Sequence, residues 1–355
     1  MRRLCKVAIM GAAVTLAMPL FMGTAGAVGG TRYVAPTGTD TGACTAHAHP
    51  CATISYAVGQ ANAGNTVNVA AGTYHETVAL TKPLVLKGAG AATTTIDGNG
   101  IDSVGSEYGV LYVGATGGTT AVSGFTITNP YPDSYTGGEP EAVALADTNA
   151  SDTVNLHNNV ITEGSSDANA STDFPIGIDS FNNAASTTIR SNTVDGFFQG
   201  MLLEDNGPAQ VLSNTVQNGI SETADTTTYA AEGVFFLSDL AQSVTGQVAN
   251  GNTFRGYGGY GVIMEAGYNN GNCTDNPCNG SISGSLARNT FTLDPGVAGT
   301  SAIVLEAKFN GNDLTATVAG NQGTVMAPST AISESATGGA TFHVTSSNNA
   351  IRVIH

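Results

Sequence analysis

The stretch Leu156-His157-Asn158-Asn159-Val160-Ile161 contains the pattern that decides the fold. An apolar residue is followed by two further residues, an asparagine, one more residue and a second apolar residue. Close copies are Ile189-x-x-Asn192-x-Val194, Val211-x-x-Asn214-x-Val216 and Leu286-x-x-Asn289-x-Phe291, and looser copies surround Asn129, Asn252 and Asn321. Recurrence of so short a unit indicates a solenoid, in which each repeat packs on its neighbours.

A second short element alternates with the first and has the pattern of a β-strand. It consists of a small residue, an apolar residue, any residue and another apolar residue, which is the alternation of a strand with two different faces. Its copies begin at Gly109, Ala142, Gly177, Gly200, Gly233, Gly261 and Ala302. Short strands bent by glycine and asparagine favour a coil of parallel β-sheets.

The spacing of the asparagines separates this coil from other repeat folds. Successive asparagines from Asn129 to Asn321 lie 30, 33, 22, 38, 37 and 32 residues apart, which fits a basic coil of 22 residues with loops inserted into most turns. Helical repeats would hold a constant period, and an antiparallel sandwich would show hairpin turns. The sequence therefore predicts an all-β chain folded as a parallel β-helix. We expect its asparagines to stack as a structural ladder and to adopt the left-handed conformation of the bend.

The section before the repeats predicts a cap for the open end of the coil. Ile54, Ala57, Val58 and Ala61 have the spacing of one short amphipathic helix, which would cover the first coil and its strand edges. Short strands are expected at 66–69, 77–80 and 84–86, with a turn at 71–74, and residues 95–98 close the section. The predicted parts are a signal peptide (1–27), the cap and first coils (28–98), coils with inserted loops (99–325), and a last coil with a C-terminal cap (326–355).

The first residues predict export. Arg2, Arg3 and Lys6 precede an apolar run that ends near Met22, and Ala25-Gly26-Ala27 has the small-residue pattern of a signal-peptide cleavage site. Cleavage there would change the net charge from −16 to −19, because it removes three basic residues. No later segment has the roughly 18 consecutive apolar residues that span a bilayer. We expect a secreted, extracellular protein whose acidic surface excludes nucleic acid as a partner, with no membrane insertion.

Four cysteines follow the signal peptide in two close pairs. Export permits disulfides, and the short spacing favours local pairing of Cys44 with Cys51 and of Cys273 with Cys278. The alternative, a shared metal–thiolate site, needs all four cysteines brought together. We expect two loop-closing disulfides, no metal site and no cofactor. Calcium stays open because the surface is acidic and rich in oxygen ligands, although no cluster of oxygen ligands marks a site.

The opening section resembles a known group of proteins. The residues that carry the resemblance are Tyr33 to Asp40, Pro50 to Ile54, Asn65 to Val69, Ala71 to Val78 and Leu86 to Gly90. They resemble the start of secreted bacterial right-handed β-helix proteins of the pectin-lyase-like superfamily, specifically over 31–98 and through the coil pattern alone from 104 to 325. The resemblance implies a right-handed parallel β-helix. It implies no single activity, because this fold carries lyases, hydrolases, esterases, epimerases, adhesins and phage tailspikes.

The enzyme signatures of this superfamily are incomplete in the chain. Glu141-Ala142-Val143-Ala144-Leu145 and Asp173-Phe174-Pro175-Ile176-Gly177 resemble motifs of pectin methylesterases, but Ala146 stands where the first motif continues with arginine. The chain also has no tryptophan for a third motif. The sequence lacks the adjacent aspartates and Gly-His-Gly segment of polygalacturonases and the arginine-rich motif of pectate lyases. An enzyme of this sequence would be a polysaccharide lyase or glycoside hydrolase without a known signature.

The outward face of the glycine-led strands contains the candidate site. If the apolar pairs of these strands point inward, Glu204, Glu265 and Glu306 point outward on one sheet face. Separated carboxylates are what glycoside hydrolysis requires, so these three are the candidate catalytic residues. The equivalent position in the Gly233 strand is Leu237, which interrupts the acidic column. The candidate ligand-binding residues of the same face are Asp179, Phe235, Ile263 and Lys308.

Two functions remain open from the sequence. A strip of apolar and acidic side chains suits a sugar chain, which predicts a protein that binds a polysaccharide or cell-surface glycan and processes it if the carboxylates act. The alternative is a non-catalytic scaffold or adhesin-like protein, in which the β-helix is a stiff rod that presents loops. The outward carboxylates would then be solvated or covered by a loop, for which the inserted segments 162–176 and 218–232 are the candidates. The histidines show no metal spacing, and we expect no chemistry at His47, which lies within the first disulfide loop.

Overall fold

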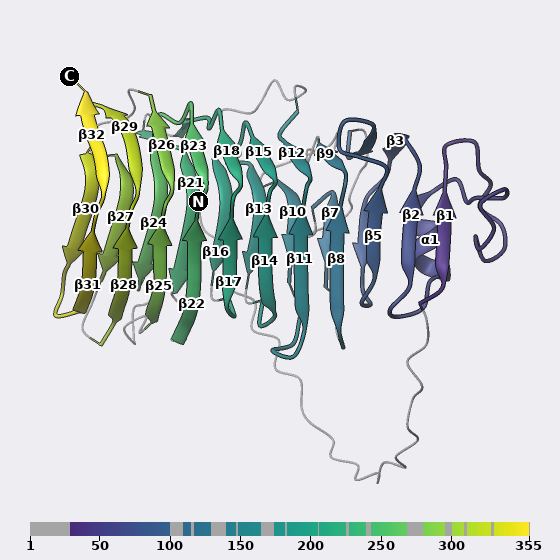
Figure 1. Ribbon diagram of the computed structural model, residues 1–355, viewed down its shortest axis with the longest axis horizontal. Coiled ribbons are helices and arrows are strands. Elements are labelled where there is room, and N and C mark those ends of the chain that lie inside the picture. Colours follow the sequence, from purple (N-terminus) through teal and green to yellow (C-terminus); the bar gives the residue numbers. More distant parts are fainter. Residues whose placement is uncertain are drawn as a thin grey trace, which may run out of the picture.

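The computed structural model describes most of the chain beyond residue 28. The described residues are 29–99, 109–114, 117–128, 140–146, 148–164, 174–181, 183–204, 206–224, 227–238, 243–267, 280–294, 300–308, 311–327 and 330–354. They form a right-handed parallel β-helix, in which strands of successive coils stack along the long axis (Figure 1). The fold predicted from the asparagine pattern is therefore confirmed.

Three parallel sheets form the walls of the coil, and each complete coil contributes one strand to each sheet, whereas the first and last coils are incomplete. The eleven-stranded sheet contains β1 (Thr31–Val34), β2 (Thr66–Val69), β5 (Val85–Gly88), β8 (Thr119–Ser123), β11 (Thr153–His157), β14 (Ser186–Arg190), β17 (Ala209–Leu212), β22 (Ser243–Asn250), β25 (Ser281–Ala287), β28 (Asp313–Ala319) and β31 (Thr341–Ser347). The ten-stranded sheet contains β3 (Gly72–His75), β6 (Thr94–Asp97), β9 (Thr126–Thr128), β12 (Val160–Thr162), β15 (Thr193–Asp195), β18 (Thr215–Gln217), β23 (Thr253–Arg255), β26 (Thr290–Leu293), β29 (Gln322–Met326) and β32 (Ala350–Ile354). The nine-stranded sheet contains β4 (Val78–Leu80), β7 (Leu111–Val113), β10 (Glu141–Leu145), β13 (Ile176–Phe181), β16 (Gln199–Glu204), β21 (Glu232–Ser238), β24 (Tyr260–Ala266), β27 (Ser301–Ala307) and β30 (Thr330–Ala336). A separate antiparallel hairpin consists of β19 (Glu222–Ala224) and β20 (Thr227–Tyr229).

Side chains that point into the coil make one continuous core. Phe236, Met264 and Leu305 stand in register on neighbouring strands and are fully buried. Phe254 and Phe291 stack with ring centroids 5.1 Å apart and an interplanar angle of 9°. Burial of each such side chain contributes about 2 kcal/mol to folding, so repetition of the coil builds the stability of the rod.

The predicted asparagine ladder is present at one corner of the coil. Asn192 Nδ2 donates to Leu156 O at 3.0 Å and to Asn214 Oδ1 at 3.1 Å. Its own Oδ1 accepts from the Asn159 backbone N at 3.0 Å. Each buried amide is thereby satisfied by the coils beside it, which removes the cost of burying a polar group. The described ladder consists of Asn159, Asn192, Asn214, Asn252, Asn289, Asn321 and Asn349, whereas Asn129 lies outside the described residues.

We expected the ladder asparagine to adopt the left-handed backbone conformation at this corner. In the structure the residue before it does so instead. The residues with positive φ are Asn158, Ser191, Ser213, Gly251, Arg288, Gly320 and Asn348, with φ between 52° and 68°. Their side chains differ in type, because the bend requires only a positive φ, which glycine and asparagine adopt most readily. The asparagine pattern is therefore set by the amide ladder alone.

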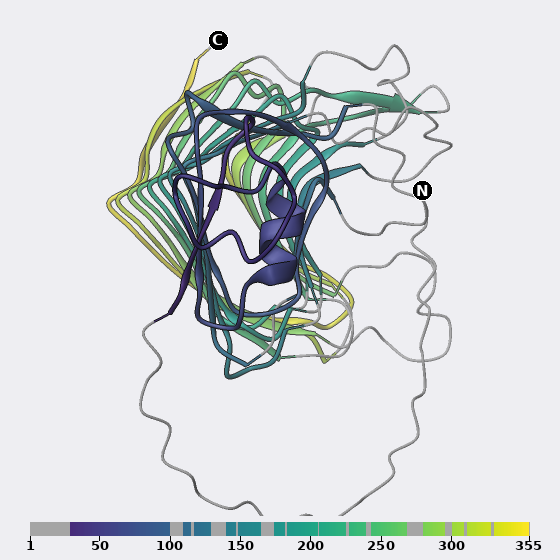
Figure 2. The same ribbon diagram turned by 90° about the vertical axis from the view of Figure 1, so that its right-hand side faces the viewer.

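Helix α1 (Ile54–Gln60) covers the first coil, as predicted from its apolar spacing (Figure 2). Thr53 caps the helix, because its hydroxyl accepts from Tyr56 N at 3.3 Å. Both oxygens of Glu76 accept from the first helical turn, at 2.7 Å from Ile54 N and 2.8 Å from Ser55 N. A carboxylate at this end accepts hydrogen bonds from the free N–H groups of the first turn, and its negative charge interacts favourably with the helix dipole. No helix of the described residues is long and apolar enough to cross a membrane.

Residues 72–75 form strand β3, so the predicted turn at 71–74 is wrong. Thr73 and Tyr74 stand in register with Thr95 and Ile96 of β6. The bend lies at Ala71, just before the strand, and Gly72 follows it with a φ of 153° and a position where a Cβ would lie 2.3 Å from Pro36 Cγ. The glycine marks the beginning of a strand and not the middle of a turn, because close approach to Pro36 excludes a side chain there.

Candidate functional site

The predicted site residues lie on the outward face of the nine-stranded sheet. Strands β16, β21, β24 and β27 stand in parallel register there, with Leu203, Phe236 and Met264 inside the core. Side chains alternate along each strand, so the residues on either side of these three point away from the core. The predicted orientation of Glu204 and Glu265 follows from this register.

The middle of this outward face is an apolar row. The row consists of Leu202, Phe235, Ile263 and Val304, which stand opposite one another on four neighbouring strands. They are only 5 to 8 % exposed, and they form a second apolar cluster outside the main core. Asp179 continues the row on β13 and is 3 % exposed. Alternation predicted which way these side chains point, but it gives no information about what covers them.

An acidic row runs beside the apolar row. Its members stand in register on five strands, in the order Glu204, Leu237, Glu265, Glu306 and Ser335. The structure therefore brings Glu265 and Glu306 together on adjacent strands. It separates Glu204 from them by one strand, on which Leu237 takes the corresponding place.

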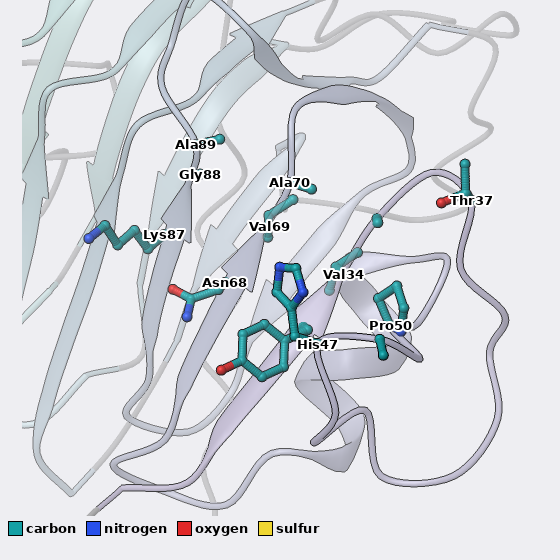
Figure 3. A pocket seen from close by; sticks show the side chains of 13 residues that line it. Val34, Thr37, His47, Pro50, Asn68, Val69, Ala70, Lys87, Gly88 and Ala89 are labelled. Carbon is teal, nitrogen blue, oxygen red and sulfur yellow. The ribbon is translucent and has the colours of Figure 1, made fainter.

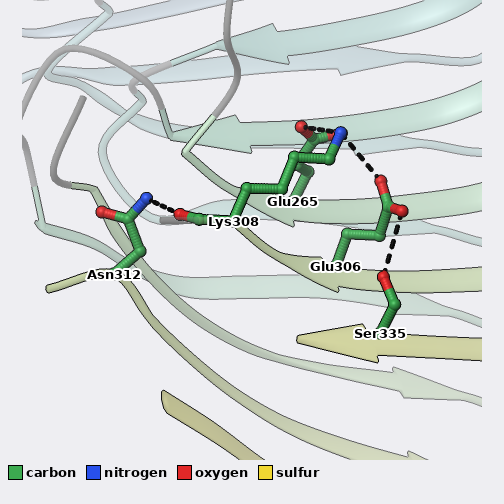
Figure 4. A network of polar contacts seen from close by, with 5 residues as sticks. All are labelled: Glu265, Glu306, Lys308, Asn312 and Ser335. Carbon is green, nitrogen blue, oxygen red and sulfur yellow. Dashed lines mark hydrogen bonds and ion pairs between the residues drawn. The ribbon is translucent and has the colours of Figure 1, made fainter. Parts of the chain in front are cut away.

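Lys308 joins the two adjacent glutamates (Figure 4). Its Nζ lies 2.7 Å from Glu265 Oε1 and 3.0 Å from Glu306 Oε2. Ser335 Oγ donates to Glu306 Oε1 at 3.1 Å, and the Asn312 amide donates to the carbonyl oxygen of Lys308. The Glu265 side chain is 5 % exposed, whereas those of Glu306 and Lys308 are about 30 % exposed. One end of the network is thus buried and the other reaches solvent.

Charge keeps Lys308 in its protonated form. Burial alone would lower the pKa of its ammonium, but the charges and hydrogen bonds of Glu265 and Glu306 outweigh burial and raise the pKa above its ordinary value. A lysine that acts as a base or nucleophile has to lose its proton near neutral pH. Lys308 is therefore a fixed positive charge that orients carboxylates and donates hydrogen bonds.

A polar row borders the apolar row on its other side. Gln199, Glu232 and Tyr260 stand in register there, and Gln199 Nε2 donates to Glu232 Oε2 at 2.6 Å. Burial and the nearby charges of Glu232 and Glu306 raise the pKa of the Tyr260 phenol. The phenol stays protonated at neutral pH and keeps its hydrogen-bond donor.

An aromatic cluster at this border was not predicted from the sequence. Phe174 packs edge-on against Phe198 at 4.9 Å and against Tyr229 at 5.4 Å between ring centroids. The two phenylalanines are buried, whereas Tyr229, at the end of hairpin strand β20, is 46 % exposed. Phe174 and Phe198 come just before strands β13 and β16, so aromatic residues next to the strand starts were the available signal.

One of the two predicted disulfides is confirmed. Cys44 and Cys51 form the predicted disulfide, with Cα atoms 5.4 Å apart. Cys273 and Cys278 lie outside the described residues, so their pairing stays a prediction. Within the described ranges, no group of three or more His, Cys, Asp or Glu side chains is arranged to hold a metal ion.

Comparison with known proteins gives one family match and several distant structural likenesses. A family model described as "Protein of unknown function (DUF1565)" matches residues 36–257. No curated protein matches the chain. An alginate lyase from Paenibacillus sp. is 15 % identical with a TM-score of 0.42, and the match covers 87 % of this chain and 99 % of the lyase. An endo-xylogalacturonan hydrolase from Aspergillus tubingensis is 14 % identical with a TM-score of 0.47, and the match covers 90 % and 93 % of the two chains.

Proposed function

We propose that this chain, which belongs to the family described as "Protein of unknown function (DUF1565)", is an extracellular protein that binds polysaccharide on the outward face of its nine-stranded sheet. The observation that carries the proposal is the apolar row with hydrogen-bonding rows on both sides of it. Sugars present C–H faces and hydroxyl groups together, so they are recognised by apolar surface placed between hydrogen-bond donors and acceptors.

Two accessible places on this face are the proposed points of contact. Tyr229 offers an exposed ring at the border with the polar row, and aromatic faces suit the C–H faces of sugars. Glu306 and Lys308 offer a partly exposed acceptor and donor at the border with the acidic row. The buried members, Asp179, Phe235 and Ile263, are too little exposed for direct contact and pack beneath these two places.

The charge of the chain favours a neutral glycan on this face. The formal net charge is −16, and a negative surface repels acidic polysaccharide in the same way as nucleic acid. Asp179, Glu204, Glu232, Glu265 and Glu306 add five carboxylates to the rows described above, against the ammonium of Lys308. Hydroxyl groups of a neutral sugar can donate to these carboxylates without any such repulsion.

Binding is supported better than catalysis at this site. A glycoside hydrolase needs two carboxylates that both reach the scissile bond, one of them as a proton donor. The Glu265 side chain is 5 % exposed and its Oε1 is bonded to Lys308, which leaves it little access to a sugar. Glu204 lies on the far side of Leu237. Catalytic roles for Glu204, Glu265 and Glu306 stay predictions that a degradation assay can decide.

A glycan array combined with a polysaccharide-degradation screen, each with and without calcium, tests the proposed function. We expect binding of neutral glycans that is independent of calcium, and no cleavage. Weakened binding by the Tyr229→Ala variant would assign the contact to this face. Absence of binding to every glycan would contradict the proposal.

A second candidate function is a non-catalytic scaffold or adhesin-like role, and burial of the apolar row favours it. If the row serves only as a packing surface, its burial is structural and the rod presents its loops to a protein partner. The array distinguishes the two functions, because a scaffold of this kind binds no glycan.

A further inference from the structure

A cavity of about 530 Å³ opens near the N-terminal end of the rod, away from the rows described above (Figure 3). It lies on the outward face of the eleven-stranded sheet, where β1, β2 and β5 meet the loop closed by the Cys44–Cys51 disulfide. Its volume falls within the range of small-molecule sites, which is roughly 300–1,000 Å³.

Three outward side chains form the floor of the cavity. Tyr33, Asn68 and Lys87 stand in register on β1, β2 and β5. Neighbouring strands are about 4.8 Å apart, so an aromatic ring, an amide and an ammonium follow one another over roughly 10 Å. Such a row offers one apolar surface and two kinds of hydrogen-bond donor to a single elongated ligand.

The disulfide loop supplies the opposite wall. His47 meets Tyr33 edge-on, with ring centroids 5.2 Å apart and an angle of 80°, so the two rings form a corner. The loop is held in place before any ligand arrives. Cys51 is fully buried, and Asp40 Oδ1 accepts from the backbone N of Ala52 at 2.8 Å and of Thr53 at 3.0 Å. A wall fixed in this way lowers the entropy cost of binding.

The charge of the cavity is opposite to that of the protein. The chain has 27 acidic residues, yet none of those in the described ranges lines the cavity, whereas Lys87 and His47 do. Lys87 is exposed, and no carboxylate of the described residues is paired with its ammonium. The ammonium is therefore available to an anionic group.

We propose that this cavity binds a saccharide unit that carries an anionic group, a carboxylate or a sulfate ester, with the anion on Lys87 and the sugar ring in the corner of Tyr33 and His47. This site is independent of the proposed function, because it lies on another sheet and takes a ligand of the opposite charge preference. A glycan with both neutral and anionic units could engage both sites, but neither site requires the other.

Titration calorimetry with three matched probes tests the site. The probes are methyl glucuronide, glucose 6-sulfate and the neutral methyl glucoside. We expect measurable binding of at least one anionic probe and at least tenfold weaker binding of the glucoside. The Lys87→Met variant should lose at least tenfold in affinity for the anionic probe, whereas the matched Lys82→Met variant, whose lysine lies outside the cavity, should bind as the wild type does. Equal binding of charged and neutral probes, no binding of any probe, or an unchanged Lys87→Met variant would overturn the proposal.

The loop wall gives a second test. A Cys44→Ser/Cys51→Ser variant releases the segment that carries His47, so it should lose affinity for the anionic probe while its circular dichroism keeps the signature of the coil. The His47→Ala variant retains the disulfide and should weaken binding by a smaller factor. Wild-type affinity in both variants would contradict a role for this wall. The Lys308→Met variant should bind the anionic probe normally, which separates this site from the nine-stranded sheet.

Discussion

Lys308 Nζ lies 2.7 Å from Glu265 Oε1, and this contact places a positive charge beside the most buried carboxylate of the acidic row. The two residues are 43 positions apart in the sequence and stand on neighbouring coils. Glu306 shares the same ammonium. The ammonium of Lys308 therefore links the carboxylates of two neighbouring strands, β24 and β27.

Replacement of Lys308 by methionine should destabilise the fold, because it leaves Glu265 buried beside Glu306 without a cation. The expected loss is about 2 kcal/mol at pH 7, below the range for fully buried pairs because Lys308 is partly exposed. The midpoint of urea unfolding measures it. The loss should shrink near pH 4, where carboxylates take up protons, and Lys82→Met should change stability by less than about 0.5 kcal/mol. A similar loss in both variants would contradict this role.

Removal of a ladder asparagine should cost more stability in the middle of the ladder than at its end. Asn214→Ala removes the amide that bonds Ile189 O and Asn252 Oδ1, and it leaves the Asn192 backbone N–H buried without an acceptor. We expect a loss of about 3 kcal/mol or more. Asn349→Ala at the half-exposed last position should cost about 1 kcal/mol, because water can replace its bonds. Equal losses in thermal or urea unfolding would contradict the ladder as the source of stability.

The raised pKa of the Tyr74 phenol predicts that the protein loses stability at alkaline pH. Burial, and secondarily the charge of Glu76, raise the pKa of its phenol to about 12 from 10.0. As the pH rises above 10 the unfolded chain releases this proton before the folded one does, so the free energy of unfolding falls between pH 10 and pH 12, by about 2 kcal/mol. The raised pKa of Lys308 acts in the same direction, because its unfolded form also deprotonates first.

Tyr74→Phe should therefore reduce the drop in unfolding free energy between pH 9 and pH 11.5. The variant also loses the 2.9 Å hydrogen bond to Ala70 O, which lowers stability equally at both pH values. Tyr56→Phe, which removes a phenol that bonds Gly42 O at the surface, serves as the control. An alkaline drop as steep in Tyr74→Phe as in the wild type would show that this phenol does not contribute.

The coil could be predicted from the sequence because the patterns that specify it lie within short segments. Asn192, Asn214 and their copies recur at one corner, and alternation around Phe236 and Met264 sets the two faces of each strand. Pairing between coils then follows from stacking identical units. The bend residue was missed, because a backbone conformation shared by serine, arginine and glycine leaves no pattern of residue types.

The candidate site was predicted only in its orientation. Glu265, Glu306 and Lys308 were expected on one outward face, and register brings them together. Burial of Phe235 and Ile263 depends on contacts between segments far apart in the chain, which alternation does not encode. The cavity at His47 was missed for the same reason, since the disulfide loop meets β2 and β5 only after folding.

Titration of the neutral oligosaccharide that binds best on the array, into the wild type and three variants, tests glycan recognition by the nine-stranded sheet most directly. Tyr229→Ala and Glu306→Gln should each weaken binding by at least tenfold, because each removes an accessible contact at one border of the apolar row. Glu334→Gln makes the same charge change at an exposed position of β30, outside the three rows, and should bind as the wild type does. Wild-type affinity in both Tyr229→Ala and Glu306→Gln would contradict sugar binding on this face.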